Sequence, residues 1–296
     1  MDWEVQLITL YLRICKEYRE RLWVNCQRFT NGGCKQFTDE ETMTIYIFGV
    51  LKGHVNIKSI HCFAENFLRA CFPTLPNYST FVHRINRLHE SFRMLIEILQ
   101  AEKIRIDDEG EYVVDSFPIT LARNNHAYTA KVASEVASKS YNATKKMYYY
   151  GVKAHVVARR RQGQLPDLEI LVLDEAARQD GPVFDQIRPL LQDNLVFADQ
   201  AYKRPDTTHV EYSQDLKVFT PIKKAKGQKK LNSQQRIFSN AVSRMRQPIE
   251  TFFGWLERIT HIQNAELVRS TAGLLTHILG KFAAAMILQT YPSLKS

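Results

Sequence analysis

The stretch EYVVDSF, residues 111–117, decides how the second half of the chain folds. It is a short apolar run that ends at Asp115, a pattern typical of a buried strand. Two more runs, MYYYGVKAHVVA at 147–158 and LEILVLDEA at 168–176, are apolar or alternating. Residues of these types favour a pleated, half-buried surface, so the three runs predict neighbouring strands.

Helices and strands alternate after these three runs. The pattern predicts a helix over 181–191, a strand over 195–198, a strand over 216–221 and a long helix over 240–259. Strands first, with alternating helices and strands after them, indicate an α/β domain in which helices cover a mixed sheet.

Residues 1–100 have helical patterns throughout. Thr38 and Glu41 have the spacing of a capping box and open a helix that runs to Gly53. A second helix covers 57–71 and ends before FPTLPN, where two prolines prevent its continuation. A third helix is expected over 79–100.

The third helix carries basic residues, among them Arg84 and Arg87, opposite its apolar face. Two helices, a proline turn and a basic helix are consistent with a helix-turn-helix DNA reader, in which these arginines would contact DNA. An ordinary amphipathic helix of a small bundle also turns its charges outward. Both interpretations stay open at this point.

The charge balance favours a polyanionic partner. The chain of 296 residues has 40 basic and 31 acidic residues, a net charge of +9. Nucleic acid is the favoured partner, although a basic surface also suits anionic membranes or solubility.

Membrane insertion and secretion are not expected. The N-terminus carries charges throughout, unlike a secretory signal. The apolar stretch 273–288 is too short to span a bilayer and is interrupted by His277 and Lys281, so it predicts a buried helix. Five cysteines without a CxxC pair indicate free thiols and a cytoplasmic protein.

Three carboxylates stand out for their chemistry. Asp115 and Asp199 each end an apolar run, and Glu250 lies on a helical pattern whose apolar face includes Ile249 and Phe252. Two aspartates at neighbouring strand ends and a helix glutamate can hold two divalent ions for phosphodiester chemistry. Oxygen ligands of this kind suit Mg²⁺ or Mn²⁺.

Each carboxylate alone is weak evidence, because a strand-end aspartate is often a turn former or a helix cap. A helix glutamate is usually solvated. Other acidic pairs, Asp107–Asp108 and Asp174–Glu175, lack a matching partner motif, and a histidine such as His155 on a strand is more often structural. No Gly-rich phosphate loop and no Gly-x-Ser-x-Gly motif occurs.

A dense lysine run, KKAKGQKK at 223–230, precedes the glutamate helix. Such a run is usually a solvated loop. Its place beside the carboxylates also suits phosphate contact by residues such as Lys223 and Lys224. Such contacts would give DNA affinity that depends on salt but not on base sequence. Trp255 either packs in the core, the default, or stacks on a base.

Several motifs in order resemble those of DDE transposases from bacterial insertion sequences. VVDSFPI resembles the first-aspartate motif, and YYYGVKAHVV has the Tyr-Gly-x-Lys-x-His core with Lys153 and His155. Asp180 stands at a His-Asp position, FADQAY resembles an Asp-x-Gly-Tyr motif, and RQPIETFFGWL resembles the glutamate motif. The likeness covers residues 38–260.

The resemblance implies an RNase H-like catalytic domain over 106–296, after a helical DNA-binding region over 1–105. Asp115, Asp199 and Glu250 would be the catalytic residues and the ligands of two Mg²⁺ or Mn²⁺ ions. Arg246 would contact a DNA phosphate, and Lys153 would help to hold the backbone. This chain departs from the family pattern at three positions. Ala201, Ser243 and Glu257 stand where the family usually has a glycine, a tyrosine and a basic residue, respectively.

The implied activity is strand cleavage at the ends of an insertion sequence, followed by strand transfer. The partners would be double-stranded DNA, as inverted-repeat ends and as target, and a second copy of the chain in a homodimer or larger assembly. The place of action would be a bacterial cytoplasm, at the nucleoid. The alternatives are an RNase H-like nuclease without strand transfer and a retired transposase that only binds DNA.

Overall fold

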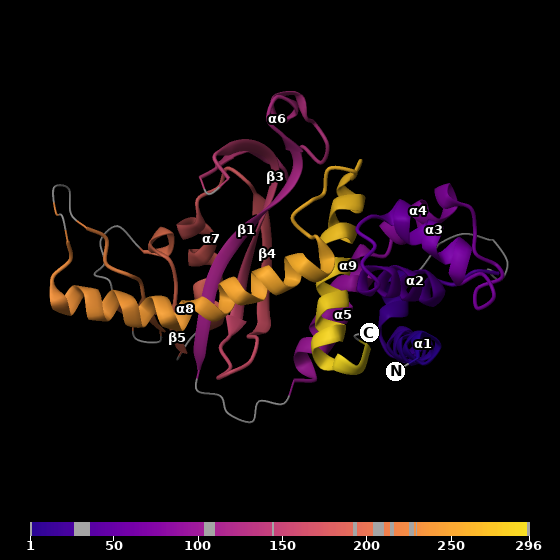
Figure 1. The fold of residues 1–296 in the computed structure, drawn as a ribbon, viewed down its shortest axis with the longest axis horizontal. Helices are drawn as coiled ribbons and strands as arrows, with labels where there is room; N and C mark the ends of the chain where they lie inside the picture. Colours follow the sequence, from indigo (N-terminus) through magenta and orange to yellow (C-terminus); the bar gives the residue numbers. More distant parts are fainter. Residues whose placement is uncertain are drawn as a thin grey trace. The chain divides into compact units, whose positions relative to one another are not determined.

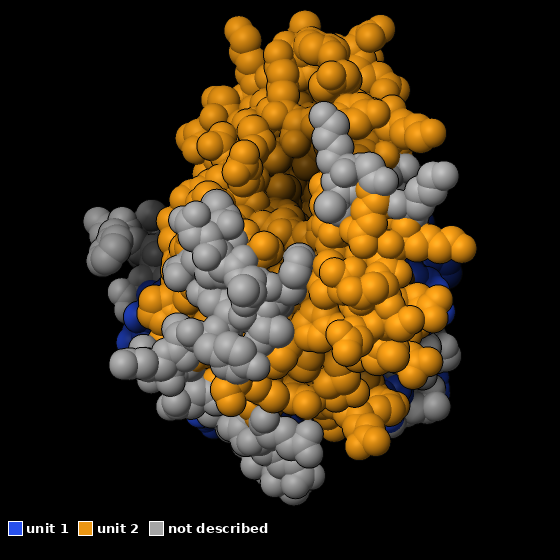
Figure 2. Space-filling model, turned by 90° about the vertical axis from the view of Figure 1, so that its left-hand side faces the viewer, with its two compact units in different colours: residues 1–103, 256–296 blue, residues 104–255 orange. Residues whose placement is uncertain are grey.

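The computed structural model of the protein describes residues 2–26, 36–103, 110–143, 145–191, 194–203, 210–213, 216–224, 228 and 230–294. Asp107, Asp108, Cys34 and two lysines of the basic run, Lys226 and Lys229, lie outside these ranges. The chain forms two compact units, residues 1–103 with 256–296 and residues 104–255 (Figure 2).

The first unit is helical, as the sequence predicts. Its elements are α1 (Trp3–Glu20), η1 (Leu22–Cys26), α2 (Asp39–Leu51), α3 (Ile57–Phe67), α4 (Tyr78–Asn86), α5 (His89–Ala101), α9 (Thr271–Thr290) and η4 (Pro292–Leu294). The predicted capping box is confirmed, because the Thr38 side chain accepts from the Glu41 N–H and the Glu41 carboxylate accepts from the Thr38 N–H.

One helix of this unit differs from the prediction. The continuous helix expected over 79–100 is two helices, α4 and α5, separated at Arg87 and Leu88. The N–H groups of these two residues donate three residues back, to Arg84 and Ile85, which tightens the last turn and ends α4. The apolar spacing continues across the break, and therefore the sequence pattern did not reveal it.

The helix α9 is nearly all buried and packs against α5 and α2. It is long and apolar enough to cross a membrane, but 83% of its most apolar window is buried inside the protein. This matches the prediction of a buried helix over 273–288. The predicted domain boundary put these residues with the catalytic domain, whereas the compact units group 256–296 with the N-terminal helices.

The second unit contains a seven-stranded mixed sheet. Its strands are β1 (Glu111–Arg123), β2 (Ser138–Asn142), β3 (Met147–Arg159), β4 (Asp167–Glu175), β5 (Asn194–Phe197), β6 (Val210–Ser213) and β7 (Leu216–Phe219). Its helical elements are α6 (His126–Thr129), α7 (Asp180–Ile187), η2 (Arg188–Leu191), η3 (Gln200–Tyr202) and most of α8 (Ser233–Thr260). The predicted strands and helices are all present.

The strand order identifies the fold of this unit. Hydrogen-bonded neighbours give the path β4-β3-β1-β5-β7, in which β1, β3 and β4 are antiparallel and β5 and β7 run parallel to β1. Three antiparallel strands followed by strands parallel to the first form the mixed sheet of an RNase H-like α/β domain, as predicted.

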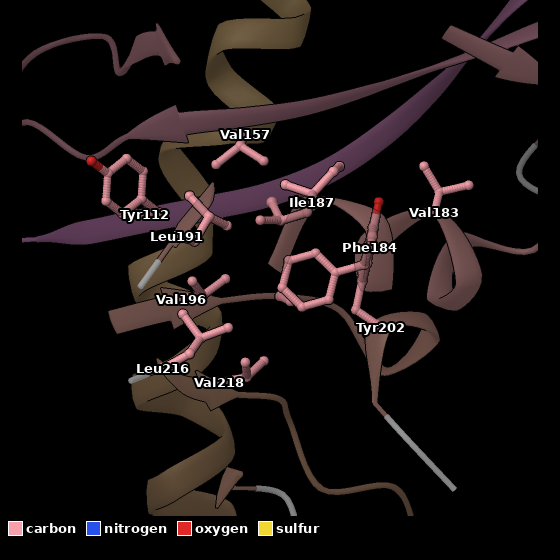
Figure 3. Packing of buried hydrophobic residues seen from close by; sticks show 12 residues of the cluster. Tyr112, Val157, Val183, Phe184, Ile187, Leu191, Val196, Tyr202, Leu216 and Val218 are labelled. Carbon is pink, nitrogen blue, oxygen red and sulfur yellow. The ribbon is translucent and has the colours of Figure 1, made fainter. Parts of the chain in front are cut away.

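Helices cover both faces of this sheet (Figure 1). Alternate residues of β1 point to opposite faces. Tyr112 and Val114 join α7 residues such as Phe184 in one apolar cluster (Figure 3), while Phe117 contacts Phe253 of α8 at 4.7 Å between ring centroids. Thus α7 packs on one face of β1 and α8 on the other.

One glycine is required by the pairing of the two long strands. Gly151 of β3 lies opposite Thr120, beside an irregularity in β1 between Thr120 and Ala122. A Cβ atom at Gly151 would lie 2.0 Å from the carbonyl oxygen of Ile119. The glycine of the Tyr-Gly-x-Lys-x-His motif therefore allows close approach of the two backbones.

Candidate active site

The two aspartates lie side by side at neighbouring strands. The parallel pairing of β1 and β5 sets Val113 opposite Phe197. Asp115 lies two residues further along, inside β1 and not at its end as predicted, because β1 continues to Arg123. Asp199 lies two residues past Phe197, just after β5 ends. The structure thus brings together two residues that are 84 positions apart (199 − 115) in the sequence.

Arg246 of α8 lies between these aspartates. Its Nη2 atom is 3.1 Å from Asp115 Oδ2, and its Nη1 atom is 3.6 Å from Asp199 Oδ1. The Arg246 side chain is 11% exposed, against 22% for Asp115 and 51% for Asp199. The guanidinium of Arg246 thus contacts two carboxylates in a partly buried position.

Glu250 follows Arg246 by one helical turn on α8. Positions four apart share a helix face, so the same face that carries Arg246 also carries Glu250. The buried residues Ile249 and Phe252 and the ring contact of Phe253 fix α8 on the sheet. The Glu250 side chain is exposed.

Two of the predicted carboxylates, Asp199 and Glu250, act on the titration of the third, Asp115. Burial raises the pKa of Asp115 from 3.8 to about 6. The N–H of Ser116 and the charge of Arg246 lower this pKa, and the charges of Asp199 and Glu250 raise it further. A partly buried carboxyl group with two like charges nearby ionises less readily unless a cation lies close to it.

The donor set fits divalent metal. Carboxylate oxygens are the ligands that Mg²⁺ and Mn²⁺ prefer, and the Arg246 guanidinium shows that the space between the two aspartates accepts a positive charge. Among the residues that the structure describes, no three His, Cys, Asp or Glu side chains are close enough to hold an ion together. Metal binding would therefore require these side chains to rearrange.

The Asp199 side chain does not cap the short helix η3 that follows it. It occupies the N-cap position of η3, yet its side chain makes no capping hydrogen bond. The alternative interpretation of a strand-end aspartate, a cap for the following helix, does not apply here. Its carboxylate is half-exposed and faces Arg246.

A family comparison agrees with this arrangement. The family model described as Transposase DDE domain matches residues 107–287. The chain belongs to this transposase family. The matched range includes β1 with Asp115, the turn with Asp199 and all of α8.

One similar solved structure is the "Drosophila P element transposase strand transfer complex", with 11% identity and a TM-score of 0.33. The match covers 71% of this chain and 47% of that chain, so this chain spans less than half of that chain's length. No curated protein matches the chain.

The predicted DNA-binding residues of the transposase have different surroundings. Lys223 and Lys224 are exposed before α8, and Arg87 is exposed at the end of α4. Arg84 donates to the carbonyl oxygen of Phe37 in the helical unit. Their DNA contacts stay predictions.

Lys153 has protein partners. Its Nζ atom lies 2.9 Å from Asp180 Oδ1 and 3.0 Å from the Arg178 carbonyl oxygen. The contact of this lysine with a DNA backbone stays a prediction. Trp255 is partly buried and stacks on Phe252, with ring centroids 5.9 Å apart, which agrees with core packing.

Sequence reasoning missed two features of the site. It assigned Arg246 to DNA phosphate and did not foresee its contact with both aspartates, although the four-residue spacing to Glu250 was a usable signal. It also gave no role to Ser116, whose N–H donates to Asp115 Oδ1 at 2.8 Å. No sequence pattern indicates that second contact.

Proposed function

We propose that this transposase cuts DNA at the ends of an insertion sequence with the help of divalent metal, and joins the freed 3′-hydroxyl to target DNA. The observation that carries the proposal is the shared contact of Arg246 with Asp115 and Asp199. It supports a site that concentrates negative charge around one cation. The charge of Glu250, which acts on Asp115, supports its inclusion.

In this proposal Asp115 and Asp199 hold the metal ions, and Glu250 completes the second position. Divalent ions held by these carboxylates would supply the charge that activates the attacking oxygen and stabilises the leaving oxygen of a phosphodiester. A carboxyl group must be ionised to bind metal, and Asp115 has a pKa of about 6 because it is buried. Metal affinity should therefore rise between pH 5 and pH 7.

Arg246 has two successive roles in the proposal. Without metal it neutralises the two aspartates. When metal takes that position, its guanidinium is free to contact a phosphate of the bound strand, as the resemblance implies. The exposed Lys223 and Lys224 add sequence-independent affinity, in keeping with the net charge of +9.

The partners in this proposal are double-stranded DNA, as element ends and as target, and a second copy of the chain. Because two element ends must be joined to the target, a dimer or larger assembly on DNA is proposed. The helical region over 1–105, including Arg84 and Arg87, is proposed to bind DNA. The proposed place of action is the nucleoid in a bacterial cytoplasm.

A cleavage assay tests the proposal. Purified protein would be incubated with a plasmid that carries the gene and its native flanks, with Mg²⁺, Mn²⁺ or EDTA, and breaks would be mapped on both strands. Asp115→Asn and Asp199→Asn would remove one ligand each. Asp174→Asn, near the end of β4, is the matched control because Asp174 pairs with Arg178 at 2.9 Å and lies opposite Lys153, on the face of the sheet that does not carry Asp115.

Metal-dependent breaks at the edges of an inverted repeat, with joined products, would support transposition if both ligand variants lose them and the control keeps them. Scattered breaks without joined products would replace the proposal with a nuclease of the same fold. Binding to DNA that is indifferent to metal, with no breaks, would identify a retired transposase that only recognises DNA.

A further inference from the structure

A polar cluster lies behind Asp115, on the opposite face of β1. The strand pairing sets Ser116 of β1 opposite His155 of β3, and Pro118 opposite Lys153. Because side chains alternate along a strand, these residues face α7, whereas Asp115 faces α8. The cluster thus uses the lysine and histidine of the Tyr-Gly-x-Lys-x-His motif, which the proposed catalysis does not need.

One carboxylate oxygen organises the cluster. Asp180 Oδ1, at the first residue of α7, lies 2.9 Å from Lys153 Nζ and accepts from the Ser116 hydroxyl at 3.2 Å. His155 Nδ1 is 3.8 Å from the same oxygen, too far for a hydrogen bond. Lys153 therefore balances the Asp180 charge, and Ser116 attaches this ion pair to β1.

His155 contributes no charge to the cluster. It is fully buried, and burial lowers its pKa to about 4, against the opposing effect of Asp180. Neither ring nitrogen has a hydrogen-bond partner among the residues that the structure describes. His155 is therefore a neutral, buried neighbour of the ion pair, and the charge balance rests on Lys153 and Asp180.

A chain of contacts leads from Asp180 to the first catalytic aspartate. The hydroxyl of Ser116 donates to Asp180, and the backbone N–H of Ser116 donates to Asp115 Oδ1 at 2.8 Å. Ser116 therefore links the two faces of β1. Its side chain bonds to Asp180 on the α7 face, and its N–H bonds to the Asp115 carboxylate on the α8 face. Losing the Asp180 contact would remove the hydrogen bond between Ser116 and α7 and loosen the backbone beside Asp115.

A second chain of contacts leads from α7 to Asp199. Phe184, one turn after Asp180, packs edge-on against Tyr202 with ring centroids 5.5 Å apart (Figure 3). The N–H of Tyr202 donates to the Asp199 carbonyl oxygen at 3.0 Å, which closes the turn η3. Burial, followed by the charges of Asp180 and Asp115, raises the pKa of Tyr202 well above its usual value, so the buried phenol stays neutral.

We propose that Asp180 is a positioning residue for the metal-binding pair: it fixes Ser116 beside Asp115, and α7 fixes Tyr202 beside Asp199. This inference rests on the proposed function, since it assumes that these aspartates bind metal. Residues that orient metal ligands typically change metal affinity by about 10- to 100-fold when they are replaced.

The test measures Mn²⁺ affinity of the full-length protein at pH 7.5, by titration calorimetry or by the loss of the free Mn²⁺ resonance signal, together with thermal unfolding. The variants are Asp180→Asn, Ser116→Ala, Asp115→Asn and the control Asp174→Asn. Ser116→Ala keeps the Lys153–Asp180 ion pair and therefore tests the contact even if Asp180→Asn fails to fold. Asp174→Asn removes a charge from the strand next to the cluster without touching Ser116.

We expect wild-type protein to bind Mn²⁺ and Asp115→Asn to lose this binding. We expect Asp180→Asn to bind about 10- to 100-fold more weakly, Ser116→Ala to weaken in the same direction, and Asp174→Asn to stay close to wild type. If Asp180→Asn or Ser116→Ala lowers the unfolding temperature and leaves the Mn²⁺ affinity unchanged, the cluster is only structural and the inference is overturned. If wild type does not bind Mn²⁺, or Asp115→Asn binds it equally well, the proposed function fails together with the inference.

Discussion

Arg246 Nη2 lies 3.1 Å from Asp115 Oδ2 and places a cation against a partly buried carboxylate. The same guanidinium lies 3.6 Å from Asp199, so one positive charge is divided between two negative ones. The charge of Arg246 does not balance the carboxylates around it, because Glu250 is a third one and also raises the pKa of Asp115. This excess of negative charge is what a divalent ion can neutralise and a single arginine cannot.

Replacing Arg246 should therefore shift the titration of Asp115 upward. The arginine lowers the pKa of Asp115, so in Arg246→Gln this pKa should rise above the value of about 6. The measurement is a carboxyl ¹³C NMR titration of Asp115 in metal-free protein. Arg244→Gln, at an exposed position two residues earlier on α8, is the control and should leave the titration unchanged. An unchanged Asp115 titration in Arg246→Gln would contradict the contact.

The buried charge of Asp115 should cost stability at neutral pH. Its folded pKa lies above the ordinary 3.8, so the folded protein binds the proton more tightly than the unfolded chain. The contribution of Asp115 to the free energy of unfolding is fully present below pH 3.8 and is lost as the pH rises through about 6. The rise in pKa from 3.8 to about 6 corresponds to roughly 3 kcal/mol.

Asp115→Asn should therefore be more stable than wild type at pH 7.5 by up to about 3 kcal/mol, and the gap should shrink toward pH 4. Urea unfolding of both proteins across this range, without divalent metal, measures the difference. A difference that does not change with pH would mean that Asp115 titrates normally in the folded protein.

The sequence predicted the sheet well because its strands are strongly patterned. The runs at 111–117, 147–158 and 168–176 are buried strands, and the capping box of Thr38 and Glu41 defined the start of α2. The sequence missed β2 (SKSYN), because this polar strand pairs with only five residues of β3 and lacks a buried face. Local propensity cannot reveal a strand that forms only beside its neighbour.

The candidate site was predicted only in part for a related reason. The motifs named Asp115, Asp199 and Glu250, but the contact of Arg246 with both aspartates depends on how α8 packs on the sheet. Likewise, the Ser116–Asp180 contact joins residues 64 apart and leaves no periodic trace. Tertiary packing decides both contacts.

Two glycines of the second unit should respond in opposite directions to alanine. In Gly151→Ala the new Cβ atom would lie 2.0 Å from the Ile119 carbonyl oxygen, and strand backbone on both sides limits relaxation. We expect a loss of roughly 3 kcal/mol or more, or no folded protein. Gly254→Ala is the matched variant, because nothing lies within 4 Å of a Cβ atom there. It should gain about 1 kcal/mol from helix propensity. Thermal unfolding compares them, and equal effects would refute the close approach at Gly151.

Lys281 should make the stability of the protein depend on alkaline pH. It is 1% exposed in α9, and burial lowers its pKa from 10.5 to about 7, against the opposing effect of Glu257. Its Nζ atom donates to the carbonyl oxygens of Val55 and His261, each at 3.1 Å, and lies 3.5 Å from the neutral His277.

Since the unfolded chain keeps the Lys281 proton up to about pH 10 and the folded protein releases it near pH 7, stability should rise with pH in this window. The expected slope is about 1.4 kcal/mol per pH unit. Lys281→Met lacks this group and should lose the rise, so that its stability relative to wild type falls as the pH increases from 7 to 10. The measurement is guanidinium unfolding of both proteins at several pH values, with Lys58→Met at an exposed site as control. If the difference between Lys281→Met and wild type is constant over this range, Lys281 stays charged in the folded protein and its burial is fully compensated by the two carbonyls.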